Sequence, residues 1–312
     1  MKIAIFGATS QIARDLVLLF SVTSDHEIVL YARSKELVTK WQNEVGLNNR
    51  YSVANFGEFN LSEDFDAVIN FIGVGSPKQA RQMGQDIFNV TLEYDNLALS
   101  YIKENPSCRY IFLSSGAVFG SNYLEPVNQL TQAVIDINNF KPEHWYGVAK
   151  IYAECRHRAS PNLPIVDLRI FNYFSHTQNI EAGFLITDAF QAIRDQTVLN
   201  TSKENIVRDY LHPCDFHQLV QCLLSTPASN HAYDCYSLAP VSKFVLLDTL
   251  KHEFGLQYQV VSNHAGIQAT GDKSNYYSCH RELEYMGYRP AWSSLEGVVD
   301  QGKKLLTLLQ RD

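Results

Sequence analysis

Short apolar runs alternate with longer amphipathic segments through the first half of this chain. The apolar runs have the length and the β-branched and aromatic character of buried strands, and they lie at residues 3–6, 27–31, 52–56, 67–72, 109–113 and 165–170. Segments long enough for helices lie between most of them, at residues 11–21, 35–44, 79–103 and 146–158. This alternation is typical of a parallel sheet with helices on both faces. We therefore predict an α/β fold built on a doubly wound parallel sheet.

The second half of the chain is less regular. The elements that we predict there are strands at 233–238 and 258–261 and a helix at 216–225. No Gly/Ser-rich or Pro-rich linker separates the halves, so a second domain should pack closely on the carboxyl-terminal edge of the sheet and leave a cleft there. The sequence predicts a doubly wound α/β domain at residues 1–171, to which part of 205–240 returns, and a smaller α/β domain mainly within 172–312.

The composition excludes several classes of protein. The 312 residues are 46% hydrophobic and 19% charged, which suits a globular protein with a full core. The net charge of −7 disfavours a nucleic-acid binder with a broad basic face, because such binding uses many Lys and Arg contacts to phosphates. No apolar stretch reaches the ~20 residues that a membrane-spanning helix needs. We expect no nucleic-acid partner and no membrane insertion.

The cysteines and histidines indicate neither a disulfide framework nor a metal site. The six cysteines include no Cys-x-x-Cys pair, and the expected state is free, mostly buried thiols. His212 and His217 flank Cys214 and Asp215 without a zinc-ligand spacing, so we expect no metal. The first strand begins at Lys2 with no signal-peptide pattern before it, which makes the cytoplasm the expected compartment.

A turn rich in small residues joins the first strand to the first helix. Its sequence, Gly7-Ala8-Thr9-Ser10-Gln11-Ile12-Ala13, stands where a dinucleotide pyrophosphate would rest on free N–H groups of the helix. Only the first of three expected glycines is present, because Ser10 and Ala13 occupy the other two positions. The segment is either an ordinary tight turn or a cofactor site, and in a cofactor site the contacts would come from Gly7, Thr9, Ser10, Gln11 and Ile12.

The end of the second strand carries basic residues. NAD enzymes usually place Asp or Glu here to bind the adenine ribose hydroxyls, but this chain has Tyr31-Ala32-Arg33-Ser34-Lys35. Arg33 and Lys35 would suit a ribose 2′-phosphate, and otherwise they are solvated residues at the start of a helix. The missing acid favours NADP(H), with NAD(H) as the alternative.

A tyrosine and a lysine four residues apart, Tyr146 and Lys150, lie on one face of a predicted helix. A nearby ammonium group favours the phenolate, so it would lower the pKa of the tyrosine toward the working pH of a proton donor. The spacing alone means little, because Tyr31 and Lys35 satisfy it too. The two Tyr–Lys pairs differ in their position in the predicted fold. Tyr146 follows a strand that leads to Ser115 at the carboxyl edge of the sheet, where ligands of such folds bind.

Several motifs, taken in their order along the chain, resemble those of the extended short-chain dehydrogenase/reductase family, in its nucleotide-sugar epimerase/dehydratase/reductase branch. The resemblance covers nearly the whole chain and rests on Tyr146 with Lys150 and on segments 112–120, 168–172, 207–215, 283–290 and 294–297. It implies a Rossmann-like fold, a nicotinamide cofactor and a nucleotide-sugar substrate.

The resemblance also implies catalytic roles for single residues. Ser115 matches the hydroxyl that hydrogen-bonds the reacting sugar oxygen, and Tyr146 matches the proton donor. Lys150 matches the group that tunes the tyrosine and binds the nicotinamide ribose. Asn89 resembles a helix asparagine that supports the active site.

On the substrate side, Asn172 and Arg208 resemble residues that hold the nucleotide diphosphate, and a bidentate guanidinium suits that charge. One departure from the family is informative. Gly116-Ala117 stands where similar 4,6-dehydratases carry an Asp-Glu pair, so the proton carriers for eliminating water are missing and we do not expect dehydration.

These residues together suggest an activity. We expect an NADPH-dependent reductase of a nucleotide-activated 4-keto sugar, in which Ser115 polarises the carbonyl and Tyr146 delivers the proton. Two alternatives stay open: an NAD-dependent nucleotide-sugar 4-epimerase, and a non-catalytic nucleotide sensor or scaffold. Proteins that look like this one commonly pair through two long helices, so the resemblance implies a homodimer formed by residues 79–103 and 146–158.

Overall fold

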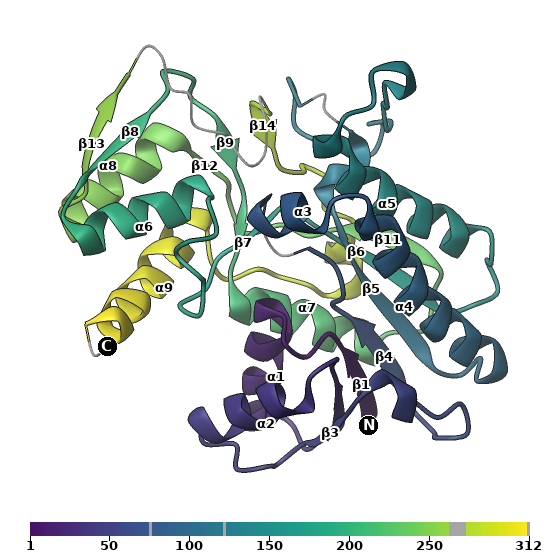
Figure 1. The fold of residues 1–312 in the computed structure, drawn as a ribbon. Helices are drawn as coiled ribbons and strands as arrows, with labels where there is room; N and C mark the ends of the chain where they lie inside the picture. Colours follow the sequence, from purple (N-terminus) through teal and green to yellow (C-terminus); the bar gives the residue numbers. More distant parts are fainter. Residues whose placement is uncertain (75–76, 121–122, 262–272, 311–312) are drawn as a thin grey trace.

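A computed structural model describes residues 1–74, 77–120, 123–261 and 273–310, and Figure 1 shows its fold. Within these residues, seven parallel strands form one large sheet in the order β11-β6-β5-β4-β1-β2-β3. The chain winds outward from β1 in both directions, so the doubly wound parallel sheet predicted from the alternation is confirmed. The strands are β1 (Lys2–Phe6), β2 (Glu27–Tyr31), β3 (Ser52–Ala54), β4 (Ala67–Asn70), β5 (Arg109–Ser115), β6 (Ile165–Ile170) and β11 (His231–Asp234).

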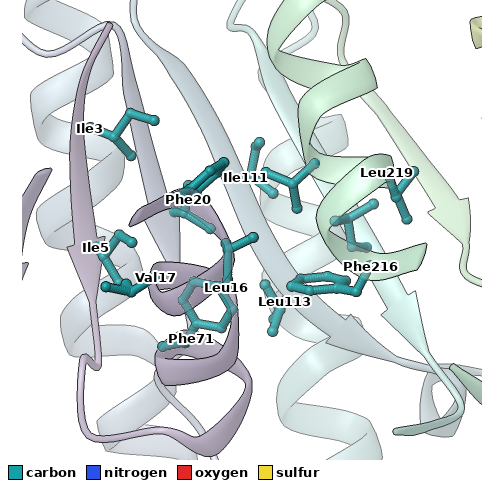
Figure 2. Packing of buried hydrophobic residues seen from close by; sticks show 14 of the residues in the cluster. Ile3, Ile5, Leu16, Val17, Phe20, Phe71, Ile111, Leu113, Phe216 and Leu219 are labelled. Carbon is teal, nitrogen blue, oxygen red and sulfur yellow. The ribbon is translucent and has the colours of Figure 1, made fainter. Parts of the chain in front are cut away.

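The side chains of β1 point alternately into two hydrophobic layers. Ile3 and Ile5 belong to one layer, which α1 (Gln11–Thr23), α2 (Lys35–Glu44) and α7 (Pro213–Ser225) complete. Figure 2 shows these two isoleucines beside Leu16, Val17 and Phe20 of α1, with Phe216 of α7 farther along the sheet. Ala4 and Phe6 belong to the opposite layer, under α4 (Asp86–Glu104) and α5 (Pro142–Arg158). Helices therefore cover both faces of the sheet, as buried parallel strands require.

A second lobe stands beside the carboxyl ends of the strands, on the left of Figure 1. Its three helices, α6 (Leu185–Asp195), α8 (Lys243–Phe254) and α9 (Ser294–Leu309), pack around a separate apolar cluster. The parallel pair β8 (Val198–Thr201) and β13 (Gln257–Val260) lies on its outer side. The smaller strands that join the lobes are β7 (Asn172–Tyr173), β9 (Val207–Arg208), β10 (Tyr210–Leu211), β12 (Val241–Ser242) and β14 (Asn275–Tyr276). From the second half of the chain, α7 and β11 return to the large sheet.

The structure differs from the prediction along the long helix at 79–103. Two helices stand there, α3 (Pro77–Met83) and α4, and the break falls at Gly84, whose φ is +56°. A glycine in the left-handed region ends a helix at little cost, because it has no Cβ to clash. The helix at 146–158 starts earlier than predicted, at Pro142, since proline suits the first helical position. Short 3₁₀ helices complete the chain: η1 (Phe56–Glu58), η2 (Gly116–Phe119), η3 (Ile137–Asn139) and η4 (Glu282–Met286).

Three further properties concern the described residues alone. None of their helices has both the length and the apolar character to cross a bilayer. They contain no group of three or more His, Cys, Asp or Glu side chains arranged to hold a metal ion. All six cysteines are free, but only Cys108 and Cys235 are buried, so the expectation of mostly buried thiols is wrong.

Candidate active site

A cleft of about 2900 Å³ opens between the carboxyl ends of the strands and the second lobe. One wall comes from the turn after β1 and the start of α1. A second wall comes from the end of β5 and from the first three turns of α5, and a third from β7, β9 and β14. In a doubly wound sheet this edge is where ligands bind, because the strand order reverses there and leaves a crevice.

The turn after β1 requires glycine at its first position, because the backbone there is left-handed and packs against Phe71 and Ile72. Gly7 has φ of +77°, and a Cβ on it would lie 3.0 Å from Cγ1 of Ile72. Ser10, the N-cap of α1, makes no side-chain capping bond. Thr9, Ser10, Gln11 and Ile12 all line the cleft, although Gln11 Nε2 already donates to Ser175 Oγ at 2.7 Å. N–H groups at the start of a helix attract anions, so this wall fits the pyrophosphate of a dinucleotide.

The two basic residues after β2 have different surroundings. Arg33 is exposed and lines the cleft, and no ion pair of this side chain is found within the described ranges. Lys35 Nζ instead forms hydrogen bonds to both carboxylate oxygens of Glu58, at 3.1 and 3.2 Å. Of the two cations, only Arg33 faces the cleft without a carboxylate beside it.

Ser115 ends β5 and caps η2. Its Oγ accepts a hydrogen bond from Ala117 N at 3.2 Å and lies 3.3 Å from the hydroxyl of Tyr276. The side chain is buried, yet it lines the cleft. The cap fixes the direction of the hydroxyl, because a Ser side chain at this position satisfies an orphan N–H of the following turn.

Tyr146 and Lys150 reach the same wall from α5. A Cβ on Gly147 would lie 2.6 Å from the carbonyl oxygen of Ala117, so the glycine allows α5 to pack directly on η2. Lys150 is buried, and its Nζ donates to the carbonyl of Leu113 at 2.6 Å. The same Nζ lies 6.0 Å from the centre of the Tyr146 ring. The structure thus brings Ser115, Tyr146 and Lys150 together, at one place in the cleft.

Burial has the largest effect on the pKa values of Tyr146 and Lys150. It raises the pKa of Tyr146 above its ordinary value, and the hydrogen bond with Ser115 opposes only part of the increase. Burial also lowers the pKa of Lys150 to about 8, against the opposing charges of Asp95, Asp167 and Glu154. The expectation that Lys150 brings the pKa of Tyr146 down is therefore wrong for this structure. The reason is that the tyrosine hydroxyl is desolvated, while the ammonium group bonds to a backbone carbonyl.

The structure does not bring Asn89 into the site. This residue is exposed on α4, whereas Val90 and Tyr94 of the same helix line the cleft. Residues four apart share a helix face, so the phase of α4, which restarts after Gly84, directs Asn89 to solvent.

The two residues predicted to hold a diphosphate both line the cleft. Asn172 Nδ2 donates to the carbonyl of Asp209 at 3.2 Å. Arg208 is buried, and its NH1 donates to the carbonyls of Val207 and Lys273, each at 2.8 Å. The carboxylate of Asp209 accepts hydrogen bonds from the Ser237 N–H at 3.1 Å and from Ser294 Oγ at 3.0 Å.

Two functional candidates, Tyr276 and Lys273, were missed by the sequence reasoning. They line the cleft because β14 pairs with β9 in a register that sets Tyr276 against Arg208. Neither residue belongs to a local motif. The only signal in the sequence is their place shortly before the family-like segment at 283–290, and that signal does not indicate which side chains enter the site.

The strand order, the turn at the start of α1 and the Ser115, Tyr146 and Lys150 group in one cleft define a protein of the short-chain dehydrogenase/reductase class. A model of the NAD dependent epimerase/dehydratase family matches residues 3–239, and the chain belongs to this family. The matched residues include every strand of the large sheet, from β1 to β11. A comparison with curated proteins found no match.

Several solved structures of nucleotide-sugar enzymes are similar to this chain. A dTDP-glucose 4,6-dehydratase from Bacillus anthracis in complex with NAD has a TM-score of 0.78 and 14% identity, over 98% of this chain and 97% of that one. A UDP-glucuronic acid 4-epimerase from Bacillus cereus, in complex with UDP-glucuronic acid and NAD, has a TM-score of 0.78 and 17% identity, over 99% and 100%. A UDP-glucose 4-epimerase from Thermotoga maritima with UDP-glucose has a TM-score of 0.77 and 16% identity, over 99% and 100%. At these identities the likeness shows the fold.

Proposed function

We propose that this protein is an NADPH-dependent reductase of a nucleotide-activated 4-keto sugar. The observation that carries the proposal is the convergence of a capped serine, a buried tyrosine and a buried lysine on the cleft that also holds the turn of α1. A bound nicotinamide supplies the hydride for the keto carbon. The protein supplies the proton and the groups that hold the reacting oxygen.

The proposed chemistry of the protein uses three side chains. Ser115 donates a hydrogen bond to the keto oxygen and polarises the carbonyl. Tyr146 transfers its phenolic proton to that oxygen as negative charge develops on it, which is general acid catalysis by a positioned group. Lys150, whose pKa is about 8, carries a positive charge over most of the neutral range and stabilises the phenolate that remains.

The residues on the first wall fit a dinucleotide. Gly7 and the N-terminus of α1 would hold its pyrophosphate, and Lys150 would bind the nicotinamide ribose. Arg33 supports the choice of NADPH, because it faces the cleft while Lys35 is held by Glu58. A guanidinium group matches a ribose 2′-phosphate through paired N–H donors.

The first test is a pair of titrations. We would remove bound nucleotide from the purified protein and titrate it with NADPH and NADH, following tryptophan fluorescence, because Trp41 and Trp145 line the cleft. We expect at least a tenfold preference for NADPH, which corresponds to about 1.4 kcal/mol. Arg33→Ala should abolish this preference. Lys35→Ala is the matched control and should retain it, since its ammonium group is paired outside the cleft.

The second test is turnover. A nucleotide-activated 4-keto sugar should be reduced with stoichiometric consumption of NADPH. A preference for NADH, or an Arg33→Ala variant that behaves like the wild type, would contradict the assignment of Arg33. If neither dinucleotide binds, a non-catalytic nucleotide sensor or scaffold becomes the better interpretation.

A second candidate function is an NAD-dependent nucleotide-sugar 4-epimerase. It is favoured by the family and by the two similar 4-epimerase structures, whose whole lengths match this chain. An epimerase would interconvert two nucleotide sugars without net consumption of cofactor, so product analysis in the absence of added NADPH distinguishes it from the reductase.

A further inference from the structure

Tyr276 reaches the reacting centre from the second half of the chain and is held in a fixed position. Its side chain is buried, and its ring makes edge contacts with Tyr123, at 4.9 Å between ring centres, and with Phe171, at 5.2 Å. Its backbone is held as well, because β14 pairs with β9 and Asn172 Nδ2 donates to the Tyr276 carbonyl at 3.5 Å. The Tyr276 hydroxyl is thereby fixed beside Ser115 Oγ, at 3.3 Å.

The Tyr276 hydroxyl keeps its proton at neutral pH. Burial raises the pKa of Tyr276 well above its ordinary value of 10, because the phenolate would be desolvated. A buried O–H donor is costly unless it finds an acceptor. Ser115 Oγ lies within hydrogen-bond distance and can serve as that acceptor.

The partners of Ser115 determine which hydroxyl of this pair donates. A serine hydroxyl has one donor and two acceptor positions. The N–H of Ala117 occupies one acceptor position of Ser115, at 3.2 Å. The hydrogen bond between Ser115 and Tyr146 favours release of the Tyr146 proton, so the single proton of Ser115 is directed at the Tyr146 oxygen. Ser115 cannot donate the same proton to Tyr276, and Tyr276 is therefore the donor to the second acceptor position.

We infer that Tyr276 is a positioning residue that acts through Ser115: its hydroxyl donates to Ser115 Oγ and directs the Ser115 proton at the reacting oxygen of the substrate. With both acceptor positions occupied, the Ser115 O–H cannot turn away from the cleft. A hydrogen bond accepted by an oxygen also polarises the O–H bond of that oxygen, which makes Ser115 the stronger donor. The inference rests on the proposed function, which assigns polarisation of the carbonyl to Ser115.

Carbon-13 NMR of protein labelled at the Cζ atoms of tyrosine tests these hydrogen bonds without substrate, because Cζ carries the hydroxyl. The Tyr276 and Tyr146 signals are identified by their loss in Tyr276→Phe and Tyr146→Phe. Ser115→Ala should shift both signals. Tyr276→Phe should shift the Tyr146 signal, because Ser115 then becomes a weaker donor to it. Tyr277→Phe is the matched control and should leave the Tyr146 signal in place, since Tyr277 is half-buried and does not line the cleft.

Steady-state kinetics with NADPH and a nucleotide-activated 4-keto sugar test the consequence for turnover. Tyr276→Phe should lower kcat by about three- to tenfold, as expected for the loss of one neutral hydrogen bond, and should leave KM unchanged. In a Ser115→Ala background the same change should have no further effect, because Tyr276 acts through the Ser115 hydroxyl. A role in packing would instead lower kcat by the same factor in both backgrounds. Titration with NADPH checks that each variant keeps its fold.

The inference is overturned if Ser115→Ala leaves the Tyr276 signal in place, or if Tyr276→Phe lowers kcat equally with and without the Ser115 hydroxyl. It is also overturned if kcat is unchanged in Tyr276→Phe, or if only KM rises, because Tyr276 would then contact the substrate directly. Failure of the proposed reductase activity would look different, since NADPH would not be consumed by any variant. In that case the NMR signals, which require neither NADPH nor a sugar, decide the inference.

Discussion

The hydroxyl of Tyr146 lies where desolvation and hydrogen bonding act against each other. Burial raises its pKa and keeps the proton on the oxygen, while the hydrogen bond with Ser115 favours its release. A phenol that stays protonated in the resting state can serve as an acid toward a developing alkoxide. Lys150, on the next turn of the same helix, provides the nearby positive charge once the proton has left.

We predict that Tyr146→Phe abolishes turnover while NADPH binding stays unchanged. The loss should be about 10²- to 10⁴-fold in kcat, the range that a positioned general acid contributes. Tyr152→Phe is the matched control, because Tyr152 lies on the same helix with 52% of its surface exposed. Stopped-flow or steady-state kinetics would compare the kcat values of both variants with that of the wild type. Substantial activity in Tyr146→Phe would show that another group delivers the proton.

At the scale of elements, a buried charged cluster joins α4, α5 and β6. His157 is fully buried, with Nδ1 2.6 Å from Asp167 Oδ1 and Nε2 2.7 Å from Asp95 Oδ1. Arg156 and Arg158 bond to the same two carboxylates. Burial alone would lower the pKa of His157, but the hydrogen bonds with Asp167 and Asp95 outweigh it and raise the pKa to about 9. The cluster holds α5, and hence Tyr146, in place from its far end.

We predict that His157 stays doubly protonated in the folded protein up to about pH 9. Nitrogen-15 NMR of the imidazole rings should show one histidine that titrates well above the others, and its signal is assigned by its loss in a His157→Gln sample. A pKa near 6.5 for this residue would contradict the cluster as described.

The consequence for stability has a definite sign. Because the folded pKa of His157 exceeds its ordinary value of 6.5, its contribution to the free energy of unfolding is fully present below about pH 6.5 and is lost as the pH rises through about 9. The lowered pKa of Lys150 acts in the opposite direction above about pH 8. The free energy of unfolding measured with urea between pH 6 and 10 therefore contains the contributions of both residues, whereas the NMR titration measures the pKa of His157 alone.

At the scale of the whole molecule, hydrogen bonds join the two lobes next to the turn after β1 and the start of α1. Asp15 of α1 is buried and accepts hydrogen bonds from Tyr173 and Thr177, both at 2.8 Å. Gln11 donates to Ser175 in the same segment. The walls of the cleft are thereby held in one arrangement, although they come from opposite halves of the chain.

We predict that the protein is a homodimer that pairs through α4 and α5. Tyr152 exposes a large aromatic ring on α5, and a two-fold axis would place it against the equivalent helices of a second copy. Light scattering after size-exclusion chromatography should give twice the mass of one chain. Tyr152→Glu should shift the protein to the mass of one chain, and a wild type that is monomeric at micromolar concentrations would contradict the proposed pairing.

The local sequence pattern was sufficient to predict much of the fold and to identify part of the candidate site. The apolar runs of the first half correspond to strands of the large sheet, because a strand buried on both faces must be apolar along its length. Ser115, Tyr146 and Lys150 could be connected from the sequence for a similar reason. The carboxyl ends of parallel strands and the helices that follow them meet at one edge of the sheet.

The sequence by itself determined the class of fold, the turn after β1 and the grouping of Ser115, Tyr146 and Lys150, since periodicity and motif order are local properties. The tertiary structure alone decided the exposure of Asn89, the direction of the Tyr146 pKa shift, and the entry of Tyr276 and Lys273 into the cleft. Helix phase, desolvation and the pairing of β14 with β9 depend on segments far apart in the chain. No local pattern contains them, because each one exists only after the chain has packed.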